Sequence, residues 1–206
     1  MSDLRIKICG LTRVEDAGLA HALGAWALGF IFFKGSKRAV EAKQVASILA
    51  ELPDAKGVGV FVNPSLDELK AVLAVAPLSL IQLHGNETEN FCQEVKALFP
   101  NLPLIKARRL QEEMSFETDY TLLDHAEKGE WGGTGKQVDW EKTGIYPKEK
   151  LILAGGIHAG NLVRANRKVR PFAFDLSSGV ESAPGIKSPE KLIELFEIAK
   201  QESTHD

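Results

Sequence analysis

Two stretches near the end of the chain decide the fold: LILAGGI at 151–157 and FAFDLSSG at 172–179. Each is a short apolar run that ends in a glycine-containing turn, and a segment with helical periodicity follows each turn. Six more apolar runs of similar length precede them. The eight runs occupy residues 4–9, 26–32, 57–62, 79–83, 104–107, 120–123, 151–154 and 172–176. Short runs of this kind are typical of buried strands.

Helix-like segments separate the strands, at 17–23, 66–76, 89–98, 161–166 and 189–201, with weaker single turns near Met114 and Trp140. Start signals precede three of them. Thr12 stands three residues before Glu15 in a capping-box arrangement, Pro64-Ser65 opens the second segment, and Asn86-Glu87 opens the third. Strands alternating with helices predict an α/β fold with a parallel sheet.

The positions of the glycines choose between two parallel architectures. An open Rossmann-type sheet usually has a glycine fingerprint after its first strand, but here the first run ends in Cys9-Gly10. Glycine-rich turns instead follow the sixth, seventh and eighth runs, and barrels commonly bind phosphate in their last loops. No linker or low-complexity tract divides the chain. We therefore predict one domain, residues 1–206, folded as an eight-stranded parallel (β/α)8 TIM barrel.

Composition limits the classes of partner. Lys and Arg number 25 against 28 Asp and Glu, a formal net charge of -3, with no basic stripe. This argues against a nucleic-acid or anionic-membrane surface, although a small anionic ligand needs only a local positive potential. No apolar stretch approaches the ~20 residues that span a bilayer, and the N-terminus lacks the pattern of a signal peptide. We expect a soluble, cytoplasmic protein.

Only two cysteines, Cys9 and Cys92, are present, far apart in the sequence. They form neither a CxxC pair nor a Cys/His cluster, so neither a disulfide framework nor a zinc site is expected. Cys92 falls in a predicted helix and is interpreted as structural.

The carboxyl ends of the predicted strands carry a selective set of side chains. In a barrel these ends surround the active site. The set is Cys9, Arg38 on the loop after the second strand, His84, Asp124, Gly155, Gly156, Asp175, Ser177, Ser178 and Gly179.

Cys9 and Asp124 each have two interpretations. Cys9 is either a small buried apolar residue or, at the end of the first strand, a base whose pKa falls toward neutrality beside cations or helix N-termini. Asp124 either caps the next loop or, in a desolvated barrel mouth, has a raised pKa and serves as an acid. A base on strand one and an acid on strand six would suit moving a proton between carbon and oxygen.

The turns at Gly155-Gly156 and Ser177-Ser178-Gly179 predict a phosphate site, since glycines let backbone N–H groups approach an anion. Asp175 would repel phosphate, so we expect it to contact substrate hydroxyls or an amine.

Arg38 is either a solvated loop charge or a bidentate ligand for a carboxylate. His84 is either catalytic or, together with Gln82, a supporting group that packs and hydrogen-bonds beside the site. The run GGTGK at 132–136 lacks the spacing of a Walker loop, because Lys136 is followed by Gln137. We interpret it as a loop that closes over the substrate.

A set of ordered motifs resembles the phosphoribosylanthranilate isomerase family along almost the whole chain. The motifs are KICG at 7–10, QLHG at 82–85, LLD at 122–124, GGTG at 132–135, LAGGI at 153–157 and DLSSGVExxPGxK at 175–187. The resemblance implies an Amadori rearrangement in tryptophan biosynthesis, acting on a small phosphorylated substrate without a metal or redox cofactor, in a monomer or homodimer.

Residue roles follow from the same resemblance. Asp124 matches the family's general acid, which protonates the furanose ring oxygen, and Cys9 matches the general base, which removes the C2 proton. Arg38 matches the arginine that holds the anthranilate carboxylate, although many relatives have Ser-Pro-Arg where this chain has Ser36-Lys37-Arg38. Losing the proline leaves this loop less constrained.

Two rival functions share the barrel. A histidine-pathway aldose-ketose isomerase would use paired carboxylates and show two half-barrel repeats, whereas here the first strand ends in Cys9 and no half-chain repeat is visible. A non-catalytic phosphate-binding barrel would need neither Cys9 nor Asp124.

Overall fold

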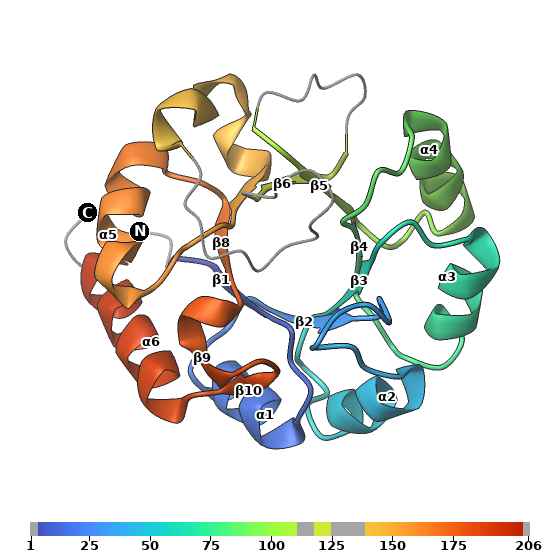
Figure 1. Cartoon of the computed structure of the whole chain (residues 1–206), viewed down its shortest axis with the longest axis horizontal. Helices are drawn as coiled ribbons and strands as arrows, with labels where there is room; N and C mark the ends of the chain where they lie inside the picture. The colour runs from blue at the N-terminus through green and yellow to red at the C-terminus, as the bar shows by residue number, and fades with distance from the viewer. Residues whose placement is uncertain (1–3, 111–117, 125–138, 204–206) are drawn as a thin grey trace.

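The computed structural model describes residues 4–110, 118–124 and 139–203. In this part of the chain, eight parallel strands form a closed barrel in chain order, with helices around it (Figure 1). The strands are β1 Ile6–Cys9, β2 Ala27–Ile31, β3 Gly57–Phe61, β4 Leu80–Leu83, β5 Leu104–Arg108, β6 Tyr120–Leu123, β7 Leu151–Leu153 and β8 Ala173–Leu176. The last strand pairs with the first, with Lys7 in register with Asp175, and this pairing closes the barrel.

The predicted fold class, a parallel (β/α)8 barrel, is confirmed. Each of the eight predicted runs overlaps one strand, and the pairing of β1 with β8 excludes an open sheet. Strands such as β3, GVGVF, are buried along their whole length. Helices cover one face of such a strand and the barrel interior covers the other, so its apolar residues do not alternate with polar ones.

The helices lie outside the barrel, as Figure 1 shows. They are α1 Val14–Ala22, α2 Ala42–Ala50, α3 Leu66–Leu73, α4 Glu89–Leu98, α5 Ala159–Val169 and α6 Pro189–Ser203, with 3-10 helices η1 Trp140–Ile145, η2 Lys148–Lys150 and η3 Ser178–Val180. After β8 the chain also forms a small antiparallel hairpin, β9 Glu181–Ala183 with β10 Ile186–Lys187. Among the described residues, no helix is long and apolar enough to cross a membrane.

Two predictions about helices need correction. The sequence analysis assigned no helix to α2, although Val45, Ile48 and Leu49 are buried with helical spacing. The predicted capping box at Thr12 is also wrong: α1 begins after Arg13, and the Thr12 hydroxyl donates to the carbonyl of Gly185 at 2.6 Å. A contact with the distant hairpin therefore replaces the local cap. The weak segment near Trp140 is η1, and the one near Met114 lies outside the described residues.

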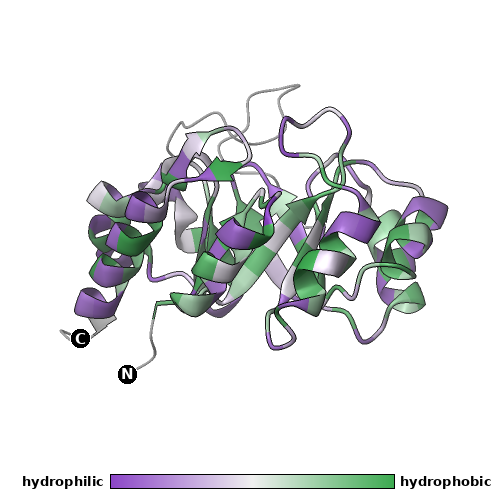
Figure 2. Ribbon diagram, turned by 90° about the horizontal axis from the view of Figure 1, so that it is seen from below, coloured by the Kyte–Doolittle hydropathy of each residue, from purple (hydrophilic) through white to green (hydrophobic). Residues whose placement is uncertain are grey.

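Side chains of each strand alternate between the barrel interior and the helices. The interior cluster consists of Cys9, Ala27, Val58, Val60, Leu80, Ile105, Ala107, Leu122, Ile152, Ala154 and Ala173. Neighbouring strand residues such as Ile8 and Phe30 belong to the larger core between strands and helices. Figure 2 shows this arrangement, with hydrophobic strands at the centre and helices whose outer faces are hydrophilic. The same alternation points Gln82 and Asp175 inward, in phase with Leu80 and Ala173.

Aromatic rings close the amino-terminal end of the barrel. Trp26 contacts Phe172 and Tyr120 edge to face, with ring centroids 5.3 and 5.9 Å apart. These residues stand at the starts of β2, β6 and β8, and the Arg5 guanidinium lies 4.5 Å from the Phe172 ring centroid. The polar side chains of the barrel interior lie toward its other, carboxyl-terminal end.

A capping box is present where Ser65 was predicted to open a helix. The Ser65 hydroxyl accepts from the Glu68 N–H at 3.2 Å, and the Glu68 carboxylate accepts from the Ser65 N–H at 2.7 Å. We expect Ser65→Ala to lower the free energy of unfolding by about 1 kcal/mol, because one orphan N–H of α3 loses its acceptor. Urea unfolding measures this, with Ser47→Ala, an exposed serine inside α2, as control. Equal stability of both variants would contradict the cap.

Candidate active site

A polar cavity lies at the carboxyl ends of β6, β7 and β8. Its lining residues are Asp124, Ala154, Gly155, Gly156, Ile157, Asp175, Leu176, Ser177, Ser178 and Gly179. Seven of these are residues that the sequence analysis singled out, so the structure brings the predicted acid and both predicted phosphate turns to one place. Barrels carry their active sites at this end.

The two glycine turns contact each other. Gly155 and Gly156 have φ of 77° and 65°, left-handed values that glycine adopts without strain. The Asn161 side chain donates to the Gly156 carbonyl at 2.8 Å, which fixes the turn against the first turn of α5. A side chain at Gly179 would collide with the carbonyl oxygen of Ile157, so only glycine lets the second turn pack against the first. Two backbone turns are thus held side by side.

Ser177 adds a buried polar group to this region. Its hydroxyl is buried and, among the described residues, has no hydrogen-bond partner. Buried hydroxyls are normally paired, and leaving one unpaired costs free energy. An anion seated between the two turns would accept this hydrogen bond.

Cys9 ends β1 with its thiol inside the barrel and only 6% of the residue exposed. A Cβ at Gly29 of β2 would lie 2.8 Å from the Cys9 Sγ, so glycine there makes the room that the thiol occupies. Burial raises the pKa of the Cys9 thiol, while the ammonium groups of Lys7 and Lys187 act against this rise. The expected pKa near neutrality is therefore wrong for this structure: cations are present, but desolvation outweighs them.

An ion pair lies beneath the thiol, between β1 and β8. Lys7 is fully buried, and its Nζ lies 2.7 Å from Oδ1 of Asp175. Burial alone would lower the pKa of Lys7, but the charges of Asp175 and Cys9 and the hydrogen bonds to them together outweigh it, and the pKa is raised. Asp175 lines the cavity as expected and also has this partner, which the sequence analysis did not identify. The sequence did contain a signal for this partner. Lys7 lies two residues before Cys9 on the same strand, so both side chains face the barrel interior.

Asp124 follows β6, with 11% of its side chain exposed. The His84 Nε2 lies 3.5 Å from Oδ2 of Asp124, and the Gln82 amide Nε2 lies 2.8 Å from the His84 Nδ1. The Gln82 amide and the Asp124 carboxylate therefore contact opposite nitrogens of the imidazole. Gln82 and His84 thus form a line of contacts that ends at Asp124.

The order of strands sets the geometry of the acid and the base. Going round the barrel, β1 is followed by β8, β7 and β6, so two strands separate Cys9 from Asp124. Those two strands carry the glycine turns and Asp175. A ligand held by its phosphate at β7 and β8 would have the thiol on one side and the carboxyl on the other.

Arg38 lies beside β1 and is held by Glu181. The guanidinium Nε and Nη2 donate to the two oxygens of Glu181 at 2.8 and 2.7 Å. Lys187, fully buried, donates to the same carboxylate at 2.9 Å and to the carbonyl of Cys9 at 2.6 Å. Burial alone would raise the pKa of Glu181, but the hydrogen bonds and charges of Arg38 and Lys187 lower it. Sequence reasoning quoted Glu181 and Lys187 within a motif but gave neither a role.

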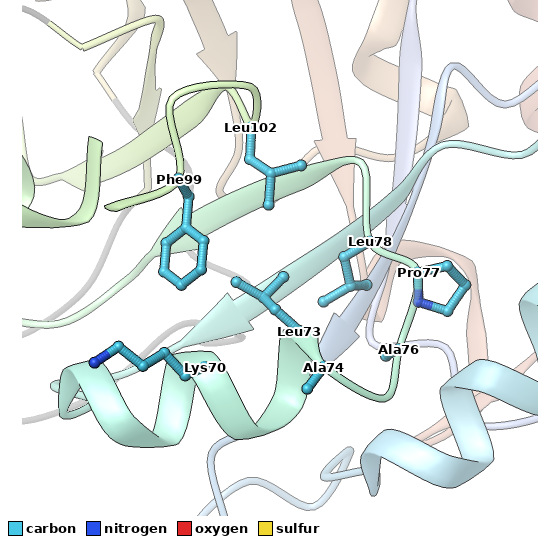
Figure 3. Close-up of a pocket in the computed structure, with 8 residues that line it drawn as sticks. All are labelled: Lys70, Leu73, Ala74, Ala76, Pro77, Leu78, Phe99 and Leu102. Atoms are coloured by element: carbon cyan, nitrogen blue, oxygen red, sulfur yellow. The ribbon is translucent and has the colours of Figure 1, made fainter. Parts of the chain in front are cut away.

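A second, apolar cavity of about 400 Å³ lies at the opposite end of the barrel (Figure 3). Leu73 and Phe99 come from the ends of α3 and α4, and Leu78 and Leu102 from the segments that lead into β4 and β5. Lys70 is its one titratable lining residue, so this cavity has no acid–base pair. The predicted closing loop, GGTGK at 132–136, lies outside the described residues.

The chain is similar to one family over nearly its full length. The family described as N-(5′-phosphoribosyl)anthranilate (PRA) isomerase matches residues 6–198. N-(5′-phosphoribosyl)anthranilate isomerase of Pseudomonas putida strain W619 is 42% identical over 210 residues, covering 98% of this chain and 100% of the relative.

Solved structures of the same family superimpose on the barrel. The crystal structure of phosphoribosyl anthranilate isomerase from Thermotoga maritima matches with a TM-score of 0.84 and 35% identity, over 96% of this chain and 99% of that one. Another, described as a complex with reduced 1-(o-carboxyphenylamino)-1-deoxyribulose 5-phosphate, matches with a TM-score of 0.80 and 32% identity, over 96% and 99%.

The reactivity of Cys9 tests the buried ion pair. Removing the ammonium of Lys7 takes away a charge that lowers the thiol pKa, so Lys7→Met raises that pKa further. We expect alkylation of Cys9 by iodoacetamide to slow roughly tenfold at a fixed, mildly alkaline pH, because the thiolate is the nucleophile. Peptide mass spectrometry follows the rate, and circular dichroism checks the fold.

Lys106→Met is the matched control, since Lys106 is also buried and pairs with Glu87 at 2.8 Å. An equal slowing in both variants would show that Lys7 has no particular effect on the thiol.

Proposed function

The chain belongs to the N-(5′-phosphoribosyl)anthranilate isomerase family, and we propose that Cys9 is its general base and Asp124 its general acid. The protein catalyses the Amadori rearrangement of N-(5-phosphoribosyl)anthranilate to 1-(2-carboxyphenylamino)-1-deoxyribulose 5-phosphate in tryptophan biosynthesis. The observation that carries the residue roles is the placement of a thiol and a carboxyl on either side of two glycine turns.

The acid acts first. Asp124 protonates the furanose ring oxygen, and the C1–O bond opens to give a Schiff base between C1 and the anthranilate nitrogen. This requires a protonated carboxyl whose proton faces the substrate. The imidazole Nε2 of His84 lies 3.5 Å from Oδ2, so we assign the transferable proton to the other oxygen, Oδ1.

The base acts second. The Cys9 thiolate removes the proton from C2, and the electron pair moves to C1=C2 while the Schiff base nitrogen is neutralised. The resulting enolamine tautomerises to the ketone. The raised pKa of the thiol makes its thiolate a stronger base than an exposed one, and the ammonium groups of Lys7 and Lys187 stabilise the charge that it carries.

The substrate's two anionic ends would bind separately. The phosphate binds at Gly155, Gly156, Ser177, Ser178 and Gly179, where backbone turns and the buried Ser177 hydroxyl offer donors. Arg38 binds the anthranilate carboxylate on the β1 side. Asp175 is paired with Lys7 and contacts the substrate hydroxyls.

We further propose that residues 1–206 form a single domain, that the protein is a monomer or a homodimer in the cytoplasm, and that it binds no nucleic acid. One barrel accommodates all eight strands, and net charge of -3 gives no basic surface. Light scattering of the purified protein measures its oligomeric state directly.

Replacing the acid or the base should stop chemistry more than binding. We expect Cys9→Ala and Asp124→Asn each to lower kcat by about 10²–10⁴-fold, with a modest loss of ligand affinity, because general acid–base groups contribute this much. The fluorescence decay of freshly prepared phosphoribosylanthranilate measures turnover.

Cys92→Ala is the control, because Cys92 is buried in α4. Near-normal turnover by Cys9→Ala or Asp124→Asn would remove that residue from its role.

Replacing Arg38 should weaken binding only of ligands that carry the anthranilate carboxylate. We expect Arg38→Ala to weaken the reduced product analogue roughly ten- to hundredfold, the range of a charge-assisted hydrogen bond lost from a carboxylate. The same analogue without its carboxyl group should bind the variant and the parent equally. Isothermal titration calorimetry compares the two ligands, and an equal loss for both would contradict a carboxylate contact.

A further inference from the structure

We propose that Glu181 is a positioning residue for substrate recognition: it holds Arg38 so that one free edge of the guanidinium meets the anthranilate carboxylate. This rests on the proposed role of Arg38. It adds Glu181 of the β9–β10 hairpin, a residue to which the acid–base steps give no role.

The contact is bidentate and largely buried. Both oxygens of Glu181 accept from Arg38, at 2.8 Å from Nε and 2.7 Å from Nη2, and the side chains are 5% and 16% exposed. Parallel N–H···O bonds of this kind fix the plane of a guanidinium as well as its position. A flexible side chain is thereby ordered before any ligand arrives, which lowers the entropic cost of binding.

The remaining donors of Arg38 match a carboxylate. A guanidinium carries five N–H groups, on two edges that can each bind a carboxylate with two hydrogen bonds. Glu181 occupies the edge made by Nε and Nη2. The edge made by Nη1 and the second Nη2 proton is the one that the pairing with Glu181 leaves for a second carboxylate, and the fixed plane determines where that edge points.

Neighbouring residues hold the Arg38–Glu181 pair against β1. Lys187 donates to Glu181 at 2.9 Å and to the Cys9 carbonyl at 2.6 Å, so one ammonium joins this pair to the strand that carries the thiol. A Cβ at Gly10 would lie 2.5 Å from Cδ of Arg38, so glycine there lets the arginine stem cross directly over the residue that follows Cys9. The hairpin thus provides the constraint that Ser36-Lys37-Arg38 lacks without a proline.

Charge neutralisation is the competing explanation of the same contact, and it predicts the opposite sign. If Glu181 only offset the charge of Arg38, its removal would leave a stronger positive potential and would tighten binding of a carboxylate. If Glu181 positions Arg38, its removal frees the guanidinium to rotate and weakens that binding.

Glu181→Gln distinguishes positioning from charge neutralisation, because it removes the charge and one acceptor but keeps the shape of the side chain. We expect the reduced product analogue to bind about tenfold more weakly, and its counterpart without the carboxyl group to bind as before. For the substrate, we expect KM to rise while kcat stays within about threefold. Glu181→Asp keeps the charge but is one methylene shorter, so we expect an intermediate loss, whereas neutralisation predicts none.

Glu202→Gln is the matched control. Glu202 holds Arg167 with the same two-bond geometry, at 3.0 and 3.1 Å, between α5 and α6. We expect this variant to bind both ligands normally. In an Arg38→Ala background, Glu181→Gln should add nothing.

Unchanged or tighter binding of the carboxylated ligand by Glu181→Gln would overturn the positioning role while leaving that of Arg38 intact. If Arg38→Ala itself fails to distinguish the two ligands, the carboxylate contact and this inference both fail.

Discussion

A fully buried ammonium stands where the first and last strands of the barrel meet. Lys7 and Asp175 lie in register on β1 and β8, and their side chains pair inside the barrel at 2.7 Å. Taking an isolated charge out of water is very costly, and removing one member of a buried pair costs about 3–5 kcal/mol. Each charge is therefore tolerated only with the other in place. The pair fixes the seam of the barrel directly below Cys9, and the rest of the site depends on that seam.

Burial also explains the pKa shifts of the residues at the carboxyl-terminal end of the barrel. Water is largely excluded from Cys9, Asp175, Glu181 and Lys187, so their charges interact strongly with one another. Desolvation raises the pKa of Cys9 and lowers that of Lys187, whereas the cations around Glu181 lower its pKa. A thiol in this environment is protonated more readily than an exposed one, and its thiolate attracts protons more strongly. A base that must take a proton from carbon benefits from this.

Sequence patterns predicted the parts that local physics determines. The strand runs, the turn at Gly155-Gly156 and the cap at Ser65 follow from apolar spacing and backbone preference, which act over a few residues. Thr12 shows the limit, since its local capping pattern lost to a contact with Gly185, far along the chain. The charged partners of the site were missed for the same reason: strand alternation turns Lys7 inward, but no local pattern indicates that Asp175 pairs with it or that Glu181 faces Arg38. The direction of the Cys9 pKa depends on depth of burial, which a motif does not encode.

The hydrogen bond from Lys187 to the carbonyl of Cys9 joins residues 178 positions apart. During synthesis, β1 leaves the ribosome long before its partner strand β8, or Lys187 on β10, exists. Loop closure over such a separation is entropically costly and slows folding. Until the C-terminal segment arrives, β1 has β2 on one side only, and open strand edges such as its other side favour aggregation. An emerging chain therefore carries the Cys9 thiol from its first residues, but it completes the surroundings of that thiol only when nearly all of the chain has been made.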